Sequence, residues 1–276
     1  MKISKYNHSV IISFLILFIC PSCYQDIIDL DISTIDRQIV IVGKIIEGNS
    51  SNYISLNRVG SLSDADNFPP VNEAEVTISD DLGNTEFLYE VTPGRYKSDS
   101  IIGEAGRVYT LQINVDAQEY YAVSQMPEPI EPDSIFVYKT SQYHNSHYLS
   151  LSFTDKEYKR DYLMIRIFVN NIHNDIYFYN DEYSNGEQIT LDDNNFKSKF
   201  YPGDNIRVVV ATLDETTYRY YTLLFDEDEI EDDDDEDDLS DLISSPEFNP
   251  INNFTNNALG YFSAQAIRTY FLNVQY

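Results

Sequence analysis

Apolar and polar residues alternate along short stretches of the first half of this chain, at residues 54–57, 76–79, 86–91 and 109–115. A period of two places every second side chain on one face, which is typical of half-buried β-strands. Residues that favour turns separate the stretches, among them Thr92, Pro93 and Gly94. About seven short strands over residues 38–124 predict an antiparallel β-sandwich of immunoglobulin-like or transthyretin-like type. The chain has no Trp, so the Cys-Trp-Cys signature of a true immunoglobulin domain is absent.

A segment rich in proline, residues 125–134, divides the chain into two predicted domains. Pro127, Pro129 and Pro132 cannot pair in a central sheet and indicate an extended connector. Strand-like stretches resume over residues 135–276, and the last of them, 259–264 and 269–274, are expected to form a closing pair.

One short helix is expected in the second domain. Asp214 or Thr216 is suited to cap it, and apolar residues then recur at helical spacing, at Tyr218, Tyr221 and 224–225. Buried-looking runs at 162–169 and 206–213 precede it. The predicted class is therefore mainly β, a sandwich followed by a second β-rich domain with one helix.

The first residues have the pattern of an export signal. Two lysines precede an apolar run at residues 10–19, which is too short to span a bilayer as a helix. Ser22 before Cys23 resembles a lipobox, although Cys20 stands where Leu is usual. We expect residues 1–22 to be a lipoprotein signal peptide, Cys23 to carry lipid that anchors the chain in a membrane, and residues 23–37 to be an acidic tether. An ordinary signal peptide is the alternative.

The formal net charge of the chain is −28. Such acidity repels phosphate backbones and anionic lipid, which argues against nucleic-acid binding. Residues 226–241 contain 13 acidic side chains among 16 positions. Blocks of like charge are usually solvated loops; a weak calcium site at Asp232, Asp233, Asp234, Asp235 and Glu236 is the alternative.

Local catalytic motifs are absent from the sequence. His144 and His147 are spaced three apart without an evident third metal ligand, and His173 is expected in a hairpin turn. We therefore expect that the protein is not an enzyme and has no cofactor. A hydrolase that uses a pair of carboxylates is the alternative, although no local motif in the sequence selects such a pair.

Tyrosine is the other abundant side chain, with 23 copies. We expect those at 89, 96 and 109 to lie in the sandwich core or at its corners. We expect those at 177, 179 and 183 to be exposed near a polar turn, where tyrosine favours interfaces.

Several ordered segments together resemble a known family: 39–45, 53–56, 70–78, 81–84, 94–96, 109–111 and 259–262. Their order is similar to that in the Bacteroidetes outer-membrane lipoproteins of domain-of-unknown-function family 4249. The resemblance implies an accessory role beside a TonB-dependent outer-membrane receptor at the cell surface, with an unknown ligand, and supplies no catalytic residues. A structural or adhesive surface protein with a calcium-binding acidic loop is the alternative function.

Overall fold

The computed structural model describes residues 38–60, 68–139, 146–157, 159–182, 186–225 and 251–275. The expected signal peptide (1–22), the tether (23–37) with Cys23, and the acidic run (226–241) with Asp232 to Glu236 lie outside these residues. His144 and Tyr183 lie outside them too. The predictions made for these parts therefore stay predictions.

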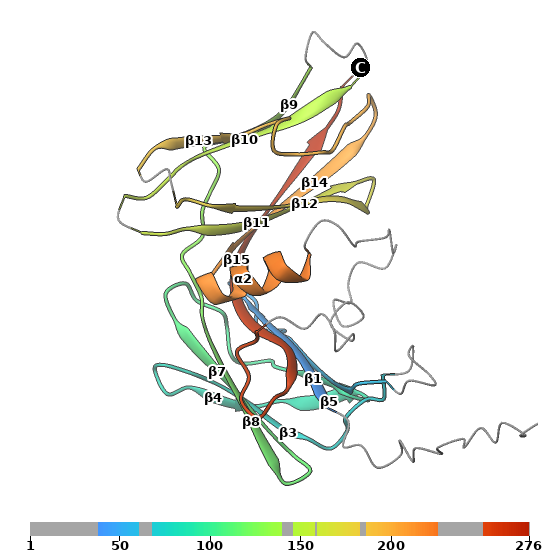
Figure 1. Ribbon diagram of the computed structural model, residues 1–276, viewed down its shortest axis with the longest axis vertical. Helices are drawn as coiled ribbons and strands as arrows, with labels where there is room; N and C mark the ends of the chain where they lie inside the picture. Colours follow the sequence, from blue (N-terminus) through green and yellow to red (C-terminus); the bar gives the residue numbers. More distant parts are fainter. Residues whose placement is uncertain are drawn as a thin grey trace, which may run out of the picture. The chain divides into compact units, whose positions relative to one another are not determined.

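The described residues are mainly β-strands, as the sequence predicts (Figure 1). The elements are β1 (Ile39–Ile46), β2 (Tyr53–Arg58), β3 (Glu75–Asp80), β4 (Thr85–Phe87), β5 (Tyr89–Thr92), β6 (Arg95–Lys97), β7 (Val108–Val115), β8 (Gln118–Gln125), β9 (Ser134–Lys139), β10 (His147–Thr154), β11 (Tyr162–Val169), β12 (Ile172–Asn180), β13 (Gln188–Leu191), β14 (Asn205–Leu213), α2 (Glu215–Leu224) and β15 (Leu259–Asn273). Among the described residues, no helix has the length and apolar character needed to cross a membrane.

The strands form three sheets. Eight of them follow the order β12-β11-β14-β15-β1-β2-β6-β5, three follow β13-β10-β9, and four follow β4-β3-β7-β8. Alternate residues of β1, β2, β3 and β7 are buried in one hydrophobic core, and alternate residues of β10, β11 and β14 are buried in another. The expected sandwich architecture is confirmed, and it occurs twice.

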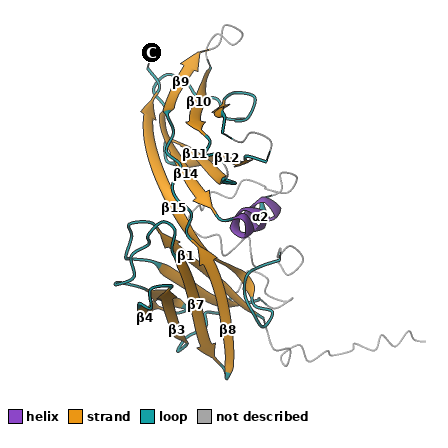
Figure 2. Cartoon of the chain, turned by 90° about the vertical axis from the view of Figure 1, so that its left-hand side faces the viewer, coloured by secondary structure: helices purple, strands orange, loops and turns teal. Residues whose placement is uncertain are grey.

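The last strand belongs to both sandwiches. The first half of β15 pairs in parallel with β1, from Val40 opposite Leu259 to Ile46 opposite Gln265, and its second half pairs antiparallel with β14 (Figure 2). The expected pair of closing strands is thus wrong, because one continuous strand of 15 residues takes their place. The predicted second domain, 135–276, is corrected accordingly: Phe262 and Ala264 are buried in the first core.

The stretch at residues 86–91 was expected to be one half-buried strand, but it is divided between β4 and β5, which lie in different sheets. Leu88 is buried between β4 and β5, and its backbone N–H donates to the carbonyl of Val76 at 2.8 Å. The alternating side chains on either side, Phe87, Tyr89 and Val91, are exposed by 67%, 47% and 40%. Because the chain passes from one sheet to another at Leu88, Leu88 faces the core, and the residues expected there are exposed.

The proline-rich segment 125–134 connects β8 to β9, but it is not a free linker. Met126 is buried in the first core and Ile130 in the second. The backbone N–H of Ile130 donates to Thr212 Oγ1 on β14 at 3.1 Å.

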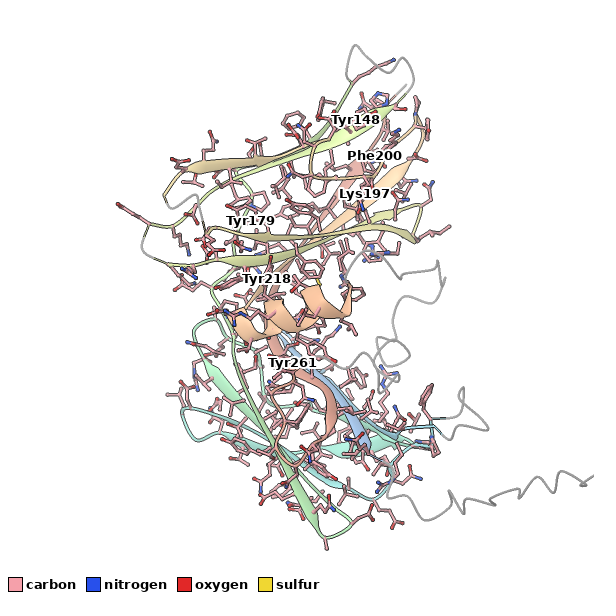
Figure 3. The ribbon with its side chains drawn as sticks, viewed as in Figure 1. Tyr148, Tyr179, Lys197, Phe200, Tyr218 and Tyr261 are labelled. Carbon is pink, nitrogen blue, oxygen red and sulfur yellow. The ribbon has the colours of Figure 1, made fainter. Side chains whose placement is uncertain are left out.

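Helix α2 covers the outer face of the eight-stranded sheet. Asp214 is the N-cap, because its Oδ1 accepts a hydrogen bond from the backbone N–H of Thr217 at 2.7 Å. Tyr220 and Tyr221 are buried, and the ring centroid of Tyr220 lies 4.4 Å from that of Tyr261 on β15. Figure 3 labels Tyr218 of α2 and Tyr261 of β15.

Candidate functional site

A hollow lies on the outer face of β1, β2 and β6, and we call it the groove. Its cavity volume is about 620 Å³. Because β-strand side chains alternate, Ile41, Ile45 and Ile54 point into the first core while their neighbours face the groove. The residues that line the groove are Val42, Lys44, Ile46, Asn49, Ser51, Asn52, Tyr53, Ser55, Asn57, Thr92, Pro93, Gly94 and Arg95.

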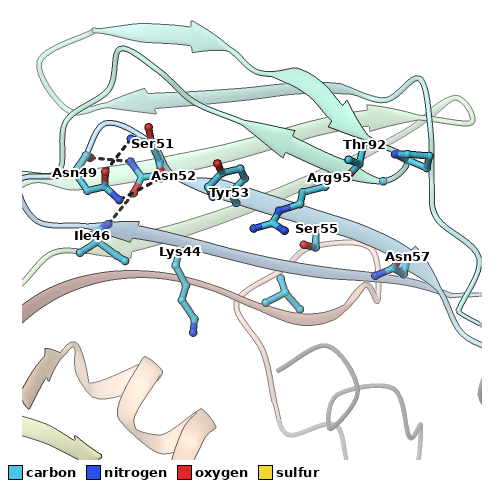
Figure 4. A pocket seen from close by; sticks show the side chains of 13 residues that line it. Lys44, Ile46, Asn49, Ser51, Asn52, Tyr53, Ser55, Asn57, Thr92 and Arg95 are labelled. Carbon is cyan, nitrogen blue, oxygen red and sulfur yellow. Dashed lines mark hydrogen bonds between the residues drawn. The ribbon is translucent and has the colours of Figure 1, made fainter. Parts of the chain in front are cut away.

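Arg95 is the central polar side chain of the groove (Figure 4). Its guanidinium carbon lies 4.3 Å from the centroid of the Tyr53 ring, a cation–π contact that holds the side chain flat over β2. Backbone pairing sets Arg95 opposite Ser55. Lys44 adds a second cation from the adjoining strand β1.

A tight turn between β5 and β6 positions Arg95. Gly94 has φ +71°, and a Cβ there would meet the carbonyl oxygen of Leu56 at 2.5 Å. The backbone N–H of Leu56 donates to the carbonyl of Gly94 at 2.7 Å. Glycine is thus required for the turn to approach β2, and the sequence signal Pro93-Gly94 predicts it.

The other rim of the groove is held by buried amide hydrogen bonds. Asn52 is 2% exposed, and its Oδ1 accepts from the backbone N–H of Ile46 at 3.0 Å. Its Nδ2 donates to the carbonyls of Asn49 and Ile101, at 3.0 and 3.3 Å. This rim is therefore fixed before any ligand arrives.

The groove differs in charge from the rest of the chain. No Asp or Glu occurs among the described residues that line it, although the chain has 46 acidic side chains. Its polar groups are hydroxyls, amides and two cations. The groove therefore suits carboxylate or hydroxyl groups of a ligand or a partner.

A second group of chemistry-bearing side chains is the aspartate cluster, which consists of Asp155, Asp161 and Asp181. One carboxylate oxygen from each lies within 4.8 Å of the others, and the three residues are 4%, 2% and 4% exposed. Among the described residues, these three side chains offer oxygen atoms close enough together to hold a metal ion.

Burial governs the protonation of the aspartate cluster. Burial raises the pKa of Asp161, the nearby Lys159 opposes that rise, and the carboxylates of Asp181 and Asp155 add to it. Burial likewise raises the pKa of Asp181, with the backbone N–H of Asp161 acting against it and Asp155 adding to it. Both shifts disfavour three negative charges in one place.

The histidines singled out in the sequence do not form a site among the described residues. His147 begins β10, where its backbone N–H donates to the carbonyl of Phe200 at 2.8 Å. His173 was expected in a hairpin turn, but it lies in β12 opposite Phe168. The turn residues are Asn170 and Asn171, both with positive φ.

The tyrosine predictions are confirmed at some positions and wrong at others. Tyr96 and Tyr109 are buried, as expected, whereas Tyr89 is exposed at the sheet edge. Tyr177 and Tyr179 were expected to be exposed, yet they pack against the second core.

Comparisons with known proteins identify a family. The family model described as "Domain of unknown function (DUF4249)" matches residues 25–270. No curated protein matches the chain. Among solved structures, a two fibronectin type-III domain segment from chicken tenascin is 12% identical, and the alignment covers 64% of this chain and 91% of that one with a TM-score of 0.22.

Proposed function

Because the chain belongs to the DUF4249 family, we propose that it is a non-catalytic, lipid-anchored accessory protein of the outer membrane that binds a ligand or partner through the groove. The partner in this proposal is a TonB-dependent receptor engaged in nutrient uptake, and the chain faces the cell surface. The pattern before Cys23 and the family resemblance support the anchor and the receptor.

The observation that carries the binding role is the charge of the groove. A chain of net charge −28 repels acidic partners over most of its surface, but the described residues that line the groove include Arg95 and Lys44 and no Asp or Glu. Arg95 is held by Tyr53, so a carboxylate can meet its guanidinium fork without first ordering it. The groove therefore favours an acidic or hydroxyl-rich segment.

The composition of the groove also supports a role without catalysis. No carboxylate, imidazole or thiol occurs among the described residues that line it. Carboxylates and imidazoles are the commonest general acids and bases, and a serine or threonine nucleophile usually needs such a base beside it. Binding is thus the chemistry for which the groove is equipped.

Co-purification from gently solubilised membranes tests the proposal. We expect the tagged chain to bring a TonB-dependent receptor with it, and we expect the double variant Lys44→Gln, Arg95→Gln to lose most of that recovery. Lys139→Gln with Arg219→Gln is the matched control, because it removes one lysine and one arginine at exposed positions away from the groove. Recovery of monomer alone, or equal loss in both double variants, would contradict the groove as the binding surface.

A further inference from the structure

The aspartate cluster lies where three strands end. Asp155 directly follows β10, Asp161 directly precedes β11, and Asp181 directly follows β12. Pairing of Tyr162 with Asn180 places Asp161 and Asp181 at the next opposed positions of the β11–β12 ladder. Asp155 arrives from the other sheet of the second sandwich. Elements far apart in the sequence thus bring the three carboxylates together.

The carboxylates are buried and incompletely paired. Asp155 Oδ1, Asp161 Oδ2 and Asp181 Oδ1 have no hydrogen-bond partner within the described part of the chain. Asp155 Oδ2 accepts a hydrogen bond from the backbone N–H of Gly186 at 2.7 Å. An unpaired oxygen on each of three side chains that are at least nine-tenths buried is rare, because such atoms lose their hydration without replacement.

The nearby positive charge does not balance the cluster. Lys159 Nζ lies 3.7 Å from Asp161 Oδ1, and the lysine side chain is 41% exposed. Lys156 is nearby, but its ammonium pairs with Glu128 at 2.9 Å. Three carboxylates and one lysine leave a charge of −2, which one divalent cation neutralises.

The donors select the type of cation. Carboxylate oxygens are hard ligands and favour calcium, magnesium or manganese over zinc or copper. Calcium binds oxygens at about 2.4 Å, so two ligand atoms on opposite sides of it lie about 4.8 Å apart. The oxygens of the cluster lie within 4.8 Å of one another, which accommodates that ion. Loops at strand ends also suit the flexible coordination of calcium better than the strict octahedron of magnesium.

The burial of the cluster excludes a large substrate. A hydrolase would need its carboxylates to touch a glycan or a peptide, which side chains at most 4% exposed cannot do.

We infer that Asp155, Asp161 and Asp181 form a calcium-binding site that fastens one end of the second sandwich. The chain between Asp155 and Asp161 crosses from the three-stranded to the eight-stranded sheet, and the chain after Asp181 crosses back to β13. One ion bound to all three residues therefore links both crossovers. This site is distinct from the acidic run at residues 226–241 and does not depend on the groove.

Calcium titration of the purified full chain tests the site. The background is a variant in which Asp232 to Asp235 become Asn and Glu236 becomes Gln, which neutralises the five carboxylates of the alternative calcium site within the acidic run. We expect saturable binding in calorimetry, and a higher melting temperature in calcium than in EDTA. Terbium, whose luminescence tyrosine sensitises, should bind saturably and be displaced by calcium.

Three single variants on that background identify the ligands. Asp155→Asn, Asp161→Asn and Asp181→Asn should each weaken calcium binding by more than about tenfold, since even partners outside the ligand shell typically contribute that much. Asp161→Asn should also melt higher than its parent in EDTA, because it removes one of three crowded charges. Asp193→Asn, an exposed aspartate elsewhere in this sandwich, is the control and should bind calcium as its parent does.

Three results would overturn the inference. One is that the parent has the same melting temperature in calcium as in EDTA. This comparison does not depend on whether the cluster variants fold. Another is calcium binding that disappears with the acidic run and leaves no saturable heat. The third is an equal response to magnesium, which would remove the assignment to calcium.

Discussion

Replacing Gly260 with Ala should destabilise the chain strongly, because this glycine lies where β15 meets β1. Its φ is +88°, and an added Cβ would lie 2.1 Å from the carbonyl oxygen of Ile41 and 2.8 Å from its carbonyl carbon. Ile41 is the residue paired with Gly260 across the parallel ladder. These contacts are backbone atoms, so no side-chain rotation relieves them.

Gly83 supplies a matched control for the magnitude. It has the same φ of +88°, but nothing lies within 4 Å of the position of its Cβ. Gly83→Ala should therefore show backbone strain alone, about 1–3 kcal/mol. Gly260→Ala adds overpacking of about 1–3 kcal/mol and the weakening of one or two ladder hydrogen bonds worth about 1 kcal/mol each. The excess of Gly260→Ala over the control is then about 2–5 kcal/mol.

Equilibrium urea unfolding measures this difference. Far-ultraviolet circular dichroism and tyrosine fluorescence both report on the transition, since the chain has 23 tyrosines and no tryptophan. We expect a much lower midpoint for Gly260→Ala than for Gly83→Ala, with similar slopes. Equal midpoints would refute the reasoning, because strain at positive φ would then explain both changes and the β1–β15 approach would not be close.

Three further predictions rest on individual carboxylates. Glu86 accepts hydrogen bonds from the backbone N–H groups of residues 99–101, and although burial raises its pKa, these bonds hold the pKa below its ordinary value. Glu86→Gln should cost about 2–3 kcal/mol in urea unfolding at pH 7, and this difference should shrink as the pH falls below 4.5 through the lower folded-state pKa. Asp214→Ala removes the helix cap and the hydrogen bond from Ser124 Oγ at 2.7 Å, so thermal unfolding should show a loss of about 2–3 kcal/mol, whereas Asp214→Asn should retain most of the cap. Burial raises the pKa of Asp161, so in EDTA the folded chain binds this proton at a higher pH than the unfolded chain does. The free energy of unfolding of the wild type relative to Asp161→Asn should therefore rise as the pH falls toward 3.8. A difference that does not change with pH would contradict the raised pKa.

Features that depend on neighbouring residues could be predicted from the sequence. The apolar run at residues 162–169 coincides with β11, and Asp214 caps α2 as one of two candidates. Period and cap chemistry act within a few residues, so the sequence itself contains their cause. The same holds for the turn at Pro93-Gly94, which positions Arg95.

Features that depend on which strands meet could not be predicted in this way. Nothing in the alternation at residues 86–91 shows that the chain changes sheets at Leu88, because the pattern is the same for one long strand and for two short ones. The shared strand β15 likewise depends on a pairing with β1, more than 200 positions earlier in the chain. The sheet change at Leu88 and the shared strand β15 both depend on contacts between residues far apart in the sequence.

The candidate sites follow the same distinction. Each member of the aspartate cluster is one of 46 acidic residues, and its position beside a strand end is a weak signal. The ladder register of β11 and β12 and the approach of β10 select these three. The groove is equally hidden in the sequence, because its cations become neighbours only when β1, β2 and β6 pair.

Because β15 belongs to both sandwiches, it couples the unfolding of the two candidate sites. The groove is built on β1, β2 and β6, and the aspartate cluster lies at the ends of β10, β11 and β12. Hydrogen-bonded ladders run without interruption from β6 to β12 through β15 and β14. A cation that binds only the folded cluster stabilises everything that unfolds together with it. The proline-rich segment therefore does not divide the chain into two independent units, because β15 joins strands of both sandwiches in one eight-stranded sheet. Binding energy at one end of that sheet opposes unfolding at the other.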